Sequence, residues 1–445
     1  MPKRGEAYDT AQAEMRTYSR IRIFSLVETM LTEVPRGFYE VEEIDNHDGE
    51  GGIHWYSISF TANQPTKMQP RLERLQPMLG NPLFESILWG HEYDLSKLNA
   101  DLRQRIESGQ FKRLVFYGMG CSSVVSDIVK GFFLNEKIPL HVQVINDYDL
   151  DWFVDRNVMK DPTTLSIIVC YSGWSVEPCL FFETMREMTG NKNLIVLSGG
   201  GKIQHLCEEH NTSIILYKLR HADREYPLYH VQQFFSIFLD LFHKLKLTPS
   251  SYHKELQDSV NFLKTEFNDA TLKKAQDIAE KLKNSRIALL STADWYVTLL
   301  KQTTMFFNEI AMVPTHRNLL HEFSHTEVAA YSNPSEKQAI ITFLDSNADQ
   351  YTKDKVKTLE GLFGSKDVPQ NKNIEFINID LNQDDFFKKF FYGHFFTVYV
   401  AYYLGIHSNV EGRDLISIAA KNPWWSQRNI ELHPKCVDIP AELKG

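Results

Sequence analysis

The sequence lacks the features that mark membrane proteins and nucleic-acid-binding proteins. It has no run of about eighteen apolar residues, which a membrane-spanning helix would need, and its first residues, MPKRGEAYDT, lack the apolar core of a signal peptide. No block of like charge occurs, because 48 Lys and Arg are mixed with 57 Asp and Glu to give a net charge of −9. We therefore expect a soluble cytoplasmic protein that binds neither membranes nor nucleic acids.

Cysteine is also scarce, and no two cysteines form a C-x-x-C pair. The chain has five, an odd number, and they are widely spread. This pattern argues against a cysteine-based structural zinc site and indicates a reducing compartment. The five are Cys121, Cys170, Cys179, Cys207 and Cys436.

Apolar strand-like runs and helical patterns alternate along most of the chain, and the series starts twice. With 445 residues, 43% of them hydrophobic, the chain can form two core domains and an appendage. Strands that alternate with helices predict parallel sheets covered on both faces, and the second series indicates a duplicated unit. The predicted strands are RLVFY, HVQVIND, LSIIVCYS, NLIVLS and SIILYKL in the first half, and RIALLS, KQAIITFLD and IEFINID in the second.

We therefore predict an α/β fold with two tandem doubly wound parallel-sheet domains, at residues 93–247 and 248–425. Residues 1–92 form an N-terminal appendage of unknown role, and residues 426–445 form a C-terminal tail. Within the appendage we predict a helix at Ala11–Thr32, an acidic loop EEIDNHDGEGG and a strand HWYSISF. Ligand sites in such sheets lie beyond the carboxyl ends of the strands, so the turns that follow the strands are where a site is expected.

Two of these turns are rich in glycine and serine, and a helix begins at each. GMGCSS follows the first strand and contains Gly120 and Ser122, whereas CYSGWSVEP ends the third strand and contains Ser172 and Ser175. Two neighbouring helix N-termini with hydroxylated residues can bind a phosphate dianion without a positive side chain. Serine is also a favoured N-cap in the absence of any ligand, but the two turns together favour an anion site.

Neither of the common nucleotide motifs fits this chain. The turn SGGGK at residues 198–202 lacks the spacing G-x-x-x-x-G-K-[ST] of a P-loop. GMGCSS lacks the last glycine of the dinucleotide fingerprint. We therefore predict no nucleotide and no other cofactor.

The pair GMGCSS and CYSGWSVEP resembles the sugar isomerase (SIS) domain family, in which the usual forms are close to GMGGS and SYSGNT-x-ET. The resemblance covers residues 113–421, and within the family the chain looks most like the bifunctional phosphoglucose/phosphomannose isomerases. In that family these turns hold the sugar phosphate, which would put Gly120, Ser122, Ser172 and Ser175 on it. The resemblance further implies interconversion of glucose 6-phosphate or mannose 6-phosphate with fructose 6-phosphate through a cis-enediol. It also implies a homodimer that builds each site from two subunits.

The resemblance implies catalytic residues as well. FFNEIA resembles the segment that carries the proton-transferring glutamate, which is Glu309 here, and HEFSHTEVA resembles the segment whose histidine helps to open the sugar ring, which is His325. ISIAAKN resembles a tail in which a lysine closes over the sugar, which is Lys421. Arg224, in HADREYPL, falls where isomerases of this family place an arginine near the enediolate.

These residue types suit the implied chemistry. Moving a proton between C1 and C2 of an open-chain sugar needs one carboxylate base, an acid–base group for ring opening and a cation near the enediolate oxygens. Glu309 lies in the otherwise apolar stretch MFFNEIAM, where desolvation makes a carboxylate a stronger base. The structural alternative is a glutamate at a helix–helix contact, satisfied by a neighbour.

Four positions of the turns depart from the family pattern. Cys121 replaces a glycine, Cys170 a serine, Trp174 an asparagine and Pro178 a threonine. Each lost hydroxyl removes a hydrogen bond to a charged group, worth about 1.5–3 kcal/mol. A non-catalytic sensor of sugar phosphates with an isomerase-like fold is therefore the alternative function.

A hydrolase motif overlaps the predicted histidine segment. HEFSH, at residues 321–325, fits H-E-x-x-H, in which two histidines bind zinc and the glutamate activates water. That motif needs a long helix and a third ligand, but here Asn333 and Pro334 follow soon after and Glu327 is too close to be the usual third ligand. We therefore predict no metal site.

Overall fold

The computed structural model describes residues 39–44, 55–60, 72–90, 92–147, 150–173, 175–220, 227–332, 334–365, 367 and 369–410. The chain divides into two compact units, of which one comprises residues 1–66 and 427–445 and the other residues 67–426. In the first unit, strands β1 (Tyr39–Ile44) and β2 (Trp55–Phe60) pair antiparallel. β2 corresponds to the predicted strand HWYSISF, but residues 42–44, predicted as part of an acidic loop, belong to β1. The predicted helix Ala11–Thr32 lies outside the described residues.

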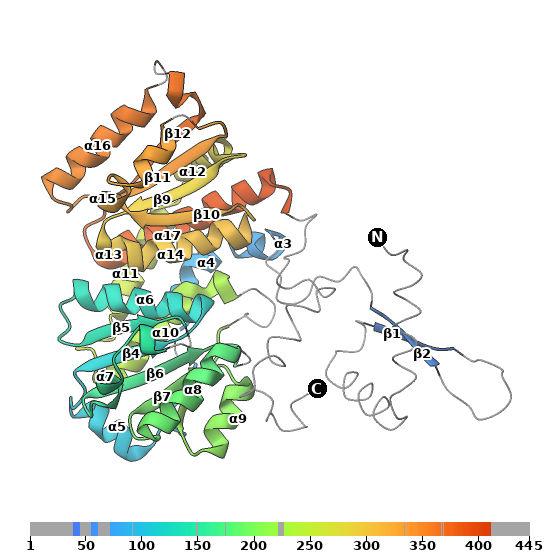
Figure 1. Cartoon of the computed structure of the whole chain (residues 1–445), viewed down its shortest axis with the longest axis vertical. Coiled ribbons are helices and arrows are strands. Elements are labelled where there is room, and N and C mark those ends of the chain that lie inside the picture. Colours follow the sequence, from blue (N-terminus) through green and yellow to red (C-terminus); the bar gives the residue numbers. More distant parts are fainter. Residues whose placement is uncertain are drawn as a thin grey trace. The chain divides into compact units, whose positions relative to one another are not determined.

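The larger unit contains two sheets, and the first of these follows the predicted series of strands (Figure 1). Its six strands have the order β3-β8-β7-β6-β4-β5, and all except β3, a two-residue strand antiparallel to β8, are parallel. Each face of this sheet has its own cluster of buried apolar residues. One cluster contains residues of helices α6 (Gly120–Asn135) and α10 (Val231–Lys244). The cluster on the other face contains residues of α7 (Arg156–Lys160), α8 (Val176–Thr189) and α9 (Gly201–Glu209). The strands are β3 (Tyr93–Asp94), β4 (Arg113–Tyr117), β5 (His141–Ile145), β6 (Thr164–Cys170), β7 (Leu194–Ser198) and β8 (Ser213–Tyr217).

The second sheet has four parallel strands in the order β10-β9-β11-β12. Three of them were predicted, and the fourth, β10, was missed. The residues of β10, THRNL, are partly or fully exposed, so the strand has no apolar run that would reveal it. The strands are β9 (Arg286–Ser291), β10 (Thr315–Leu319), β11 (Gln338–Asp345) and β12 (Ile374–Leu381).

Helices cover both faces of the second sheet. One of them is a continuous helical segment at Ala293–Ile310, made of α13 (Ala293–Trp295), a π-helical turn, α14 (Lys301–Met305) and a second π-helical turn. We refer to it as the Glu309 helix. The other helices of this half are α11 (His253–Glu266), α12 (Asp269–Leu282), α15 (Leu320–Phe323), α16 (Gln350–Gly364) and α17 (Phe386–His407). Together the sheets, with their strands parallel and helices on both faces, confirm the predicted tandem α/β architecture.

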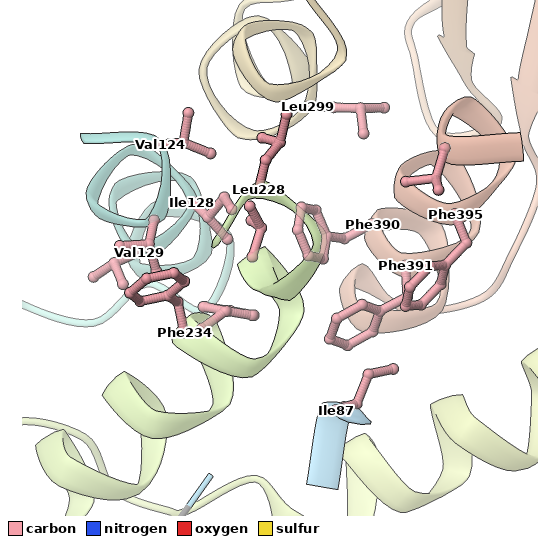
Figure 2. Packing of buried hydrophobic residues seen from close by; sticks show 14 of the residues in the cluster. Ile87, Val124, Ile128, Val129, Leu228, Phe234, Leu299, Phe390, Phe391 and Phe395 are labelled. Atoms are coloured by element: carbon pink, nitrogen blue, oxygen red, sulfur yellow. The ribbon is translucent and has the colours of Figure 1, made fainter. Parts of the chain in front are cut away.

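One apolar core joins the two halves of the larger unit. Figure 2 shows Val124 and Ile128 of α6 near Phe234 of α10, all in the first half. Leu299 and Phe390 of the second half belong to the same core. Helix α17 contributes most, because it is buried around nearly its whole circumference, which is typical of a helix that runs through a core. None of the described helices is long and apolar enough to cross a membrane.

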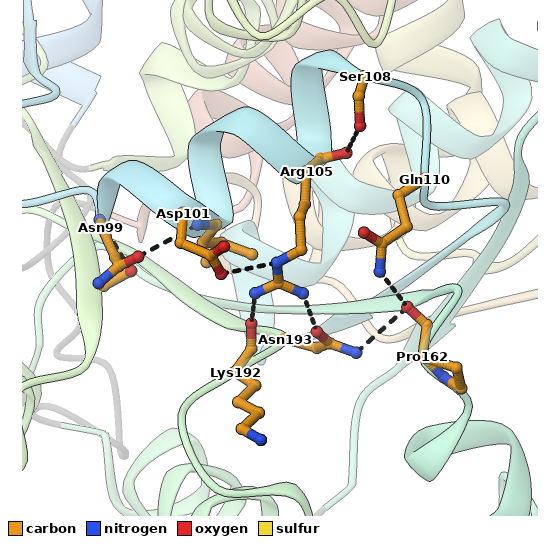
Figure 3. Close-up of polar contacts among 10 residues, drawn as sticks. Asn99, Asp101, Arg105, Ser108, Gln110, Pro162, Lys192 and Asn193 are labelled. Carbon is orange, nitrogen blue, oxygen red and sulfur yellow. Dashed lines mark hydrogen bonds and ion pairs between the residues drawn. The ribbon is translucent and has the colours of Figure 1, made fainter.

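A short polar network secures the amino end of the first sheet. Arg105, in helix α5 (Ala100–Glu107), donates hydrogen bonds to the Oδ1 atom of Asn193 (2.6 Å) and to the main-chain oxygen of Lys192, and it pairs with Asp101 (2.9 Å; Figure 3). Gln110 donates to the carbonyl of Pro162 just before β6 (3.1 Å). These contacts occupy the edge where β6 and β7 begin, so that edge has a structural role.

Candidate functional site

The carboxyl edge of the first sheet contains a topological switch point. Strands β4 and β6 are parallel neighbours, but the helices that follow them, α6 and α8, pack in the clusters on opposite faces of the sheet. The two connections therefore diverge at this point, which is where open α/β sheets bind ligands. Both glycine- and serine-rich turns of the sequence lie at this point.

Glycines allow the backbones of these turns to approach one another closely. Gly173 has a φ of +73°, and a Cβ atom there would lie 1.8 Å from the carbonyl oxygen of Gly200 in the turn after β7. Gly118 faces the carbonyl oxygen of Val169 in the same way, at 2.9 Å from an added Cβ atom. Gly120, the first residue of α6, has a φ of +52°. Only glycine fits the backbone of Gly173 without a shift of the neighbouring turn.

The three predicted serines come together at the end of β6. The hydroxyl of Ser122, in the first turn of α6, accepts a hydrogen bond from the main-chain N–H of Tyr171 (3.4 Å). The hydroxyls of Ser172 and Ser175 both interact with the thiol of Cys170, the last residue of β6. Ser172 is exposed, Ser175 is half-buried and Ser122 is buried. The two turns therefore place hydroxyls from both helix starts around one position.

The thiol of Cys170 lies at the centre of this arrangement, which the sequence did not reveal. The main-chain N–H groups of Gly173 and Ser175 also make hydrogen bonds with its sulfur. Burial raises the pKa of the Cys170 thiol, and these donors partly offset the effect. The thiol sulfur thus accepts hydrogen bonds from two N–H groups that would otherwise be available to an anion.

The Glu309 helix packs antiparallel along α6, and this packing determines where Glu309 lies. At the far end of α6, a Cβ atom added to Gly131 would lie 2.0 Å from Cγ2 of Thr298, so the two helices touch there. About one helical turn nearer the start of α6, Lys301 pairs with Asp127 at 2.6 Å. The series ends with Glu309 beside Cys121, the second residue of α6.

Glu309 and Cys121 are near enough to interact electrostatically. Burial raises the pKa of the Cys121 thiol well above its usual range, and the nearby carboxylate of Glu309 raises it further. Cys121 directly precedes Ser122, so Glu309 of the second half lies near the first turn of α6. Glu309 belongs to the π-helical turn Phe306–Ile310. Such turns are rare and often occur at functional sites.

His325 lies elsewhere on the same chain. Phe323 and Tyr331, which flank it, pack in the cluster on the outer face of the second sheet, whereas Phe306 and Ile310 of the Glu309 helix pack in the core on its inner face. The side chain of His325 is exposed. One chain therefore does not bring Glu309 and His325 together.

The H-E-x-x-H segment lacks the geometry of a zinc site. Helix α15 has only four residues, Leu320–Phe323, and ends before the second histidine. The ring of His321 stacks on Tyr351 (5.5 Å between centroids) and contacts Thr352 (3.3 Å). Over the described part of the chain, no group of three His, Cys, Asp or Glu could hold a metal ion.

Three other residues from the sequence analysis cannot be placed in this site. Arg224, Lys421 and Trp174 lie outside the described residues. The fourth altered position, Pro178, is buried in the first turn of α8, where proline is tolerated.

Comparison with known proteins agrees with this architecture. Residues 271–420 match the family model described as the bacterial phospho-glucose isomerase C-terminal SIS domain, and this stretch includes both Glu309 and His325. Residues 271–420 are therefore similar to a SIS domain, and both halves of the larger unit have the same class of α/β fold.

Individual relatives are more distant. The chain is 24% identical over 234 residues to the bifunctional phosphoglucose/phosphomannose isomerase of Aquifex aeolicus, an alignment that covers 53% of this chain and 67% of the relative. Its fold is similar to that of tagatose-6-phosphate ketose/aldose isomerase from Escherichia coli, with a TM-score of 0.51 and 14% identity. That alignment covers 75% of this chain and 92% of the other.

Proposed function

We propose that this protein is a phosphosugar aldose–ketose isomerase, most similar in activity to phosphoglucose/phosphomannose isomerases. The observation that carries the proposal is the position of Glu309 at the start of α6, beside the turn that contains Ser122. A carboxylate within reach of a phosphate cradle can move a proton between C1 and C2 of the open-chain sugar through a cis-enediol. The names of the relatives, which include two sugar-phosphate isomerases, support the same reaction class.

Each residue then has a defined role. Ser122, Ser172, Ser175 and the backbone at Gly120 bind the phosphate, because hydroxyl and N–H donors at helix N-termini stabilise a dianion. Glu309 transfers the proton, and His325 acts in ring opening. Arg224 stabilises the enediolate charge and Lys421 closes over the sugar, as the family resemblance implies.

The separation of Glu309 and His325 supports a homodimer. Because the two residues lie on opposite faces of the second sheet, a site that uses both takes His325 from a second copy. Mixing Glu309→Gln and His325→Gln protomers tests this directly, since each variant alone is inactive. A shared site predicts recovery of about a quarter of the wild-type activity, because half of the dimers regain one intact site. No recovery after subunit exchange would contradict the shared site.

The reaction itself is tested with fructose 6-phosphate in deuterated water. We expect deuterium at C2 of the aldose product for the wild type and at least about a thousandfold less for Glu309→Gln, since that amide cannot accept the proton. Binding of fructose 6-phosphate should persist in the variant, which separates lost chemistry from lost folding. Label that persists in Glu309→Gln would contradict the role of Glu309.

A non-catalytic sensor is the second candidate, and one observation favours it. The Cys170 thiol already engages the N–H and hydroxyl donors of the second turn. A cradle of this kind can bind a phosphosugar more weakly than a cradle of hydroxyls alone. Binding of fructose 6-phosphate by the wild type without any deuterium incorporation would favour the sensor.

A further inference from the structure

A buried tyrosine hydroxyl near the switch point has no hydrogen-bond partner among the described residues. Tyr217 is the last residue of β8, and its side chain is 2% exposed. Its Oη atom makes no hydrogen bond with any of the described residues. Buried polar groups in proteins nearly always have a partner, so this hydroxyl requires an explanation.

The ring contacts of Tyr217 place it on the inner face of the sheet. Its ring packs against Tyr171 of the β6 turn (5.6 Å between centroids) and against Phe234 and Phe238 of α10 (5.7 and 6.1 Å). These contacts hold the ring between the β6 turn and α10. The phenol is therefore a rigid group whose hydroxyl has a defined position.

The Tyr217 hydroxyl lies near residues of both turns. It interacts electrostatically with Cys170 at the end of β6, with Tyr171 and with Cys121 at the start of α6. Cys121 in turn interacts with Glu309. Burial, followed by these neighbours, raises the pKa of the Tyr217 hydroxyl well above its usual range, so the group is a hydrogen-bond donor at neutral pH.

The neighbouring thiols are poor partners for this donor, because sulfur is a weak acceptor. An oxygen of a bound ligand would be a better one. Cys121 is only partly buried, and the single side-chain torsion of a cysteine allows its thiol to move aside. In the resembled family a glycine stands at this position.

We propose that Tyr217 is a further substrate-binding residue, whose hydroxyl donates a hydrogen bond to an oxygen of a sugar phosphate held between the two turns. This inference rests on the proposed function and adds to it a residue that lies on β8, outside both serine turns. The ligand oxygen would be the hydrogen-bond partner that this hydroxyl lacks among the described residues.

Tyr217→Phe removes the hydroxyl and keeps the ring. We expect binding of fructose 6-phosphate, measured by titration calorimetry, to weaken about tenfold. The midpoint of thermal unfolding should stay the same or rise, because the lost hydroxyl makes no hydrogen bond within the described part of the protein. A parallel titration with inorganic phosphate shows whether the ligand oxygen belongs to the phosphate group or to the sugar.

Tyr117→Phe is the matched control. Tyr117 ends β4 at the same edge of the sheet and is also buried, but its ring lies in the cluster on the opposite face, against Phe181 (5.5 Å). Its substitution should leave fructose 6-phosphate binding at the wild-type level. Wild-type binding by Tyr217→Phe, or equal weakening in both variants, would overturn the proposal.

The outcomes also separate this inference from the proposed function. If the wild type binds fructose 6-phosphate and Glu309→Gln abolishes exchange while Tyr217→Phe changes nothing, only the role of Tyr217 is wrong. If Tyr217→Phe weakens binding but no exchange occurs, the ligand contact stands and the isomerase assignment is wrong. If the wild type binds neither probe, both are wrong.

Discussion

The carboxyl edges of the two sheets have the same topology and opposite chemistry. At the first edge, the turns offer serine hydroxyls and glycine N–H groups. At the second edge, a cavity of about 670 Å³ is lined by six carboxylates, those of Glu136, Asp294, Asp345, Asp349, Asp384 and Asp385. Its one lining lysine, Lys389, is already paired with Asp345. A phosphate dianion is favoured at the first edge and repelled at the second.

Helix capping accounts for much of this acidity. Asp349 accepts a hydrogen bond from the N–H of Thr352 at the start of α16, and Asp385 accepts one from the N–H of Lys388 at the start of α17. The second half thus uses the starts of its helices for stability, and the catalytic residue that we propose in this half, Glu309, lies at the opposite end of a helix. Two sheets of similar topology therefore differ in chemistry, because the turn residues decide it.

Substitution of Gly173 at the first edge should have the largest effect on stability and on ligand binding. In Gly173→Ala the new Cβ atom would overlap the carbonyl of Gly200, so the turns must separate. We expect a loss of about 3 kcal/mol or more in the free energy of unfolding, together with loss of fructose 6-phosphate binding. Gly190→Ala is the control, since Gly190 also has a positive φ (+61°) but no atom within 4 Å of an added Cβ. Denaturant unfolding and calorimetry measure both effects, and similar losses in the two variants would show that backbone strain alone is responsible.

Breaking the ion pair at the second edge should affect stability but not binding. The carboxylate of Asp345 accepts hydrogen bonds from Lys389, from the indole N–H of Trp295 (2.8 Å) and from the main-chain N–H of Asn347 (2.7 Å). Lys389→Met leaves that buried carboxylate without its cation, which costs about 3 kcal/mol. Urea unfolding should show this loss while fructose 6-phosphate affinity stays unchanged. Weakened binding would mean that the two edges are coupled.

The junction between the halves should respond to acid. Burial lowers the pKa of His394 to about 3, and its ring contacts Gln302 of the second half (2.9 Å) and Gln232 of the first (3.3 Å). Because an unfolded histidine titrates near 6.5, the unfolded state binds the extra proton between these values. Stability should then fall by about 1.4 kcal/mol per pH unit as the pH drops from about 6.5 toward 3.

The variant His394→Phe isolates this contribution. Its free energy of unfolding, measured by urea titration at pH 7.5, 6 and 5, should fall less steeply with acid than that of the wild type. The expected difference in slope corresponds to about one proton. Equal slopes in the two proteins would contradict the assignment to His394.

The smallest effect is expected from the contact that aligns Glu309. Gly131→Ala places a methyl group against Cγ2 of Thr298, which should cost about 1–2 kcal/mol and slow deuterium exchange by displacing the Glu309 helix. Adding Thr298→Ser removes the clashing methyl and keeps the hydroxyl, so the double variant should recover both properties. An unchanged exchange rate in Gly131→Ala would show that this contact does not position Glu309.

The sequence predicted those parts of the fold that depend on continuous apolar runs. Strands such as RLVFY and RIALLS are buried by helices and could be recognised, whereas the exposed edge strand THRNL could not. The pairing of the two serine turns followed from topology, because β4 and β6 had to be neighbours for both turns to meet.

Other parts of the site depend on packing that no local pattern shows. The contact of Glu309 with the start of α6 depends on how α6 crosses the Glu309 helix, which is set by Gly131, Thr298 and the Asp127–Lys301 pair. The hydrogen bonds of Cys170 and the buried hydroxyl of Tyr217 depend on side-chain directions at the ends of separate strands. Sequence could identify Cys170 as a departure from a family pattern but could not show what the thiol contacts.

The single aromatic core has a consequence for how the protein can be divided. Phenylalanines of α10 and α17 pack on each other across the middle of the larger unit, for example Phe235 on Phe390 at 5.6 Å. A fragment ending near residue 247 would leave that hydrophobic surface open to water and prone to aggregation. Although the two halves have similar architecture, neither is expected to be expressible or exchangeable as an autonomous module, and a genetic fusion of either half alone should be insoluble.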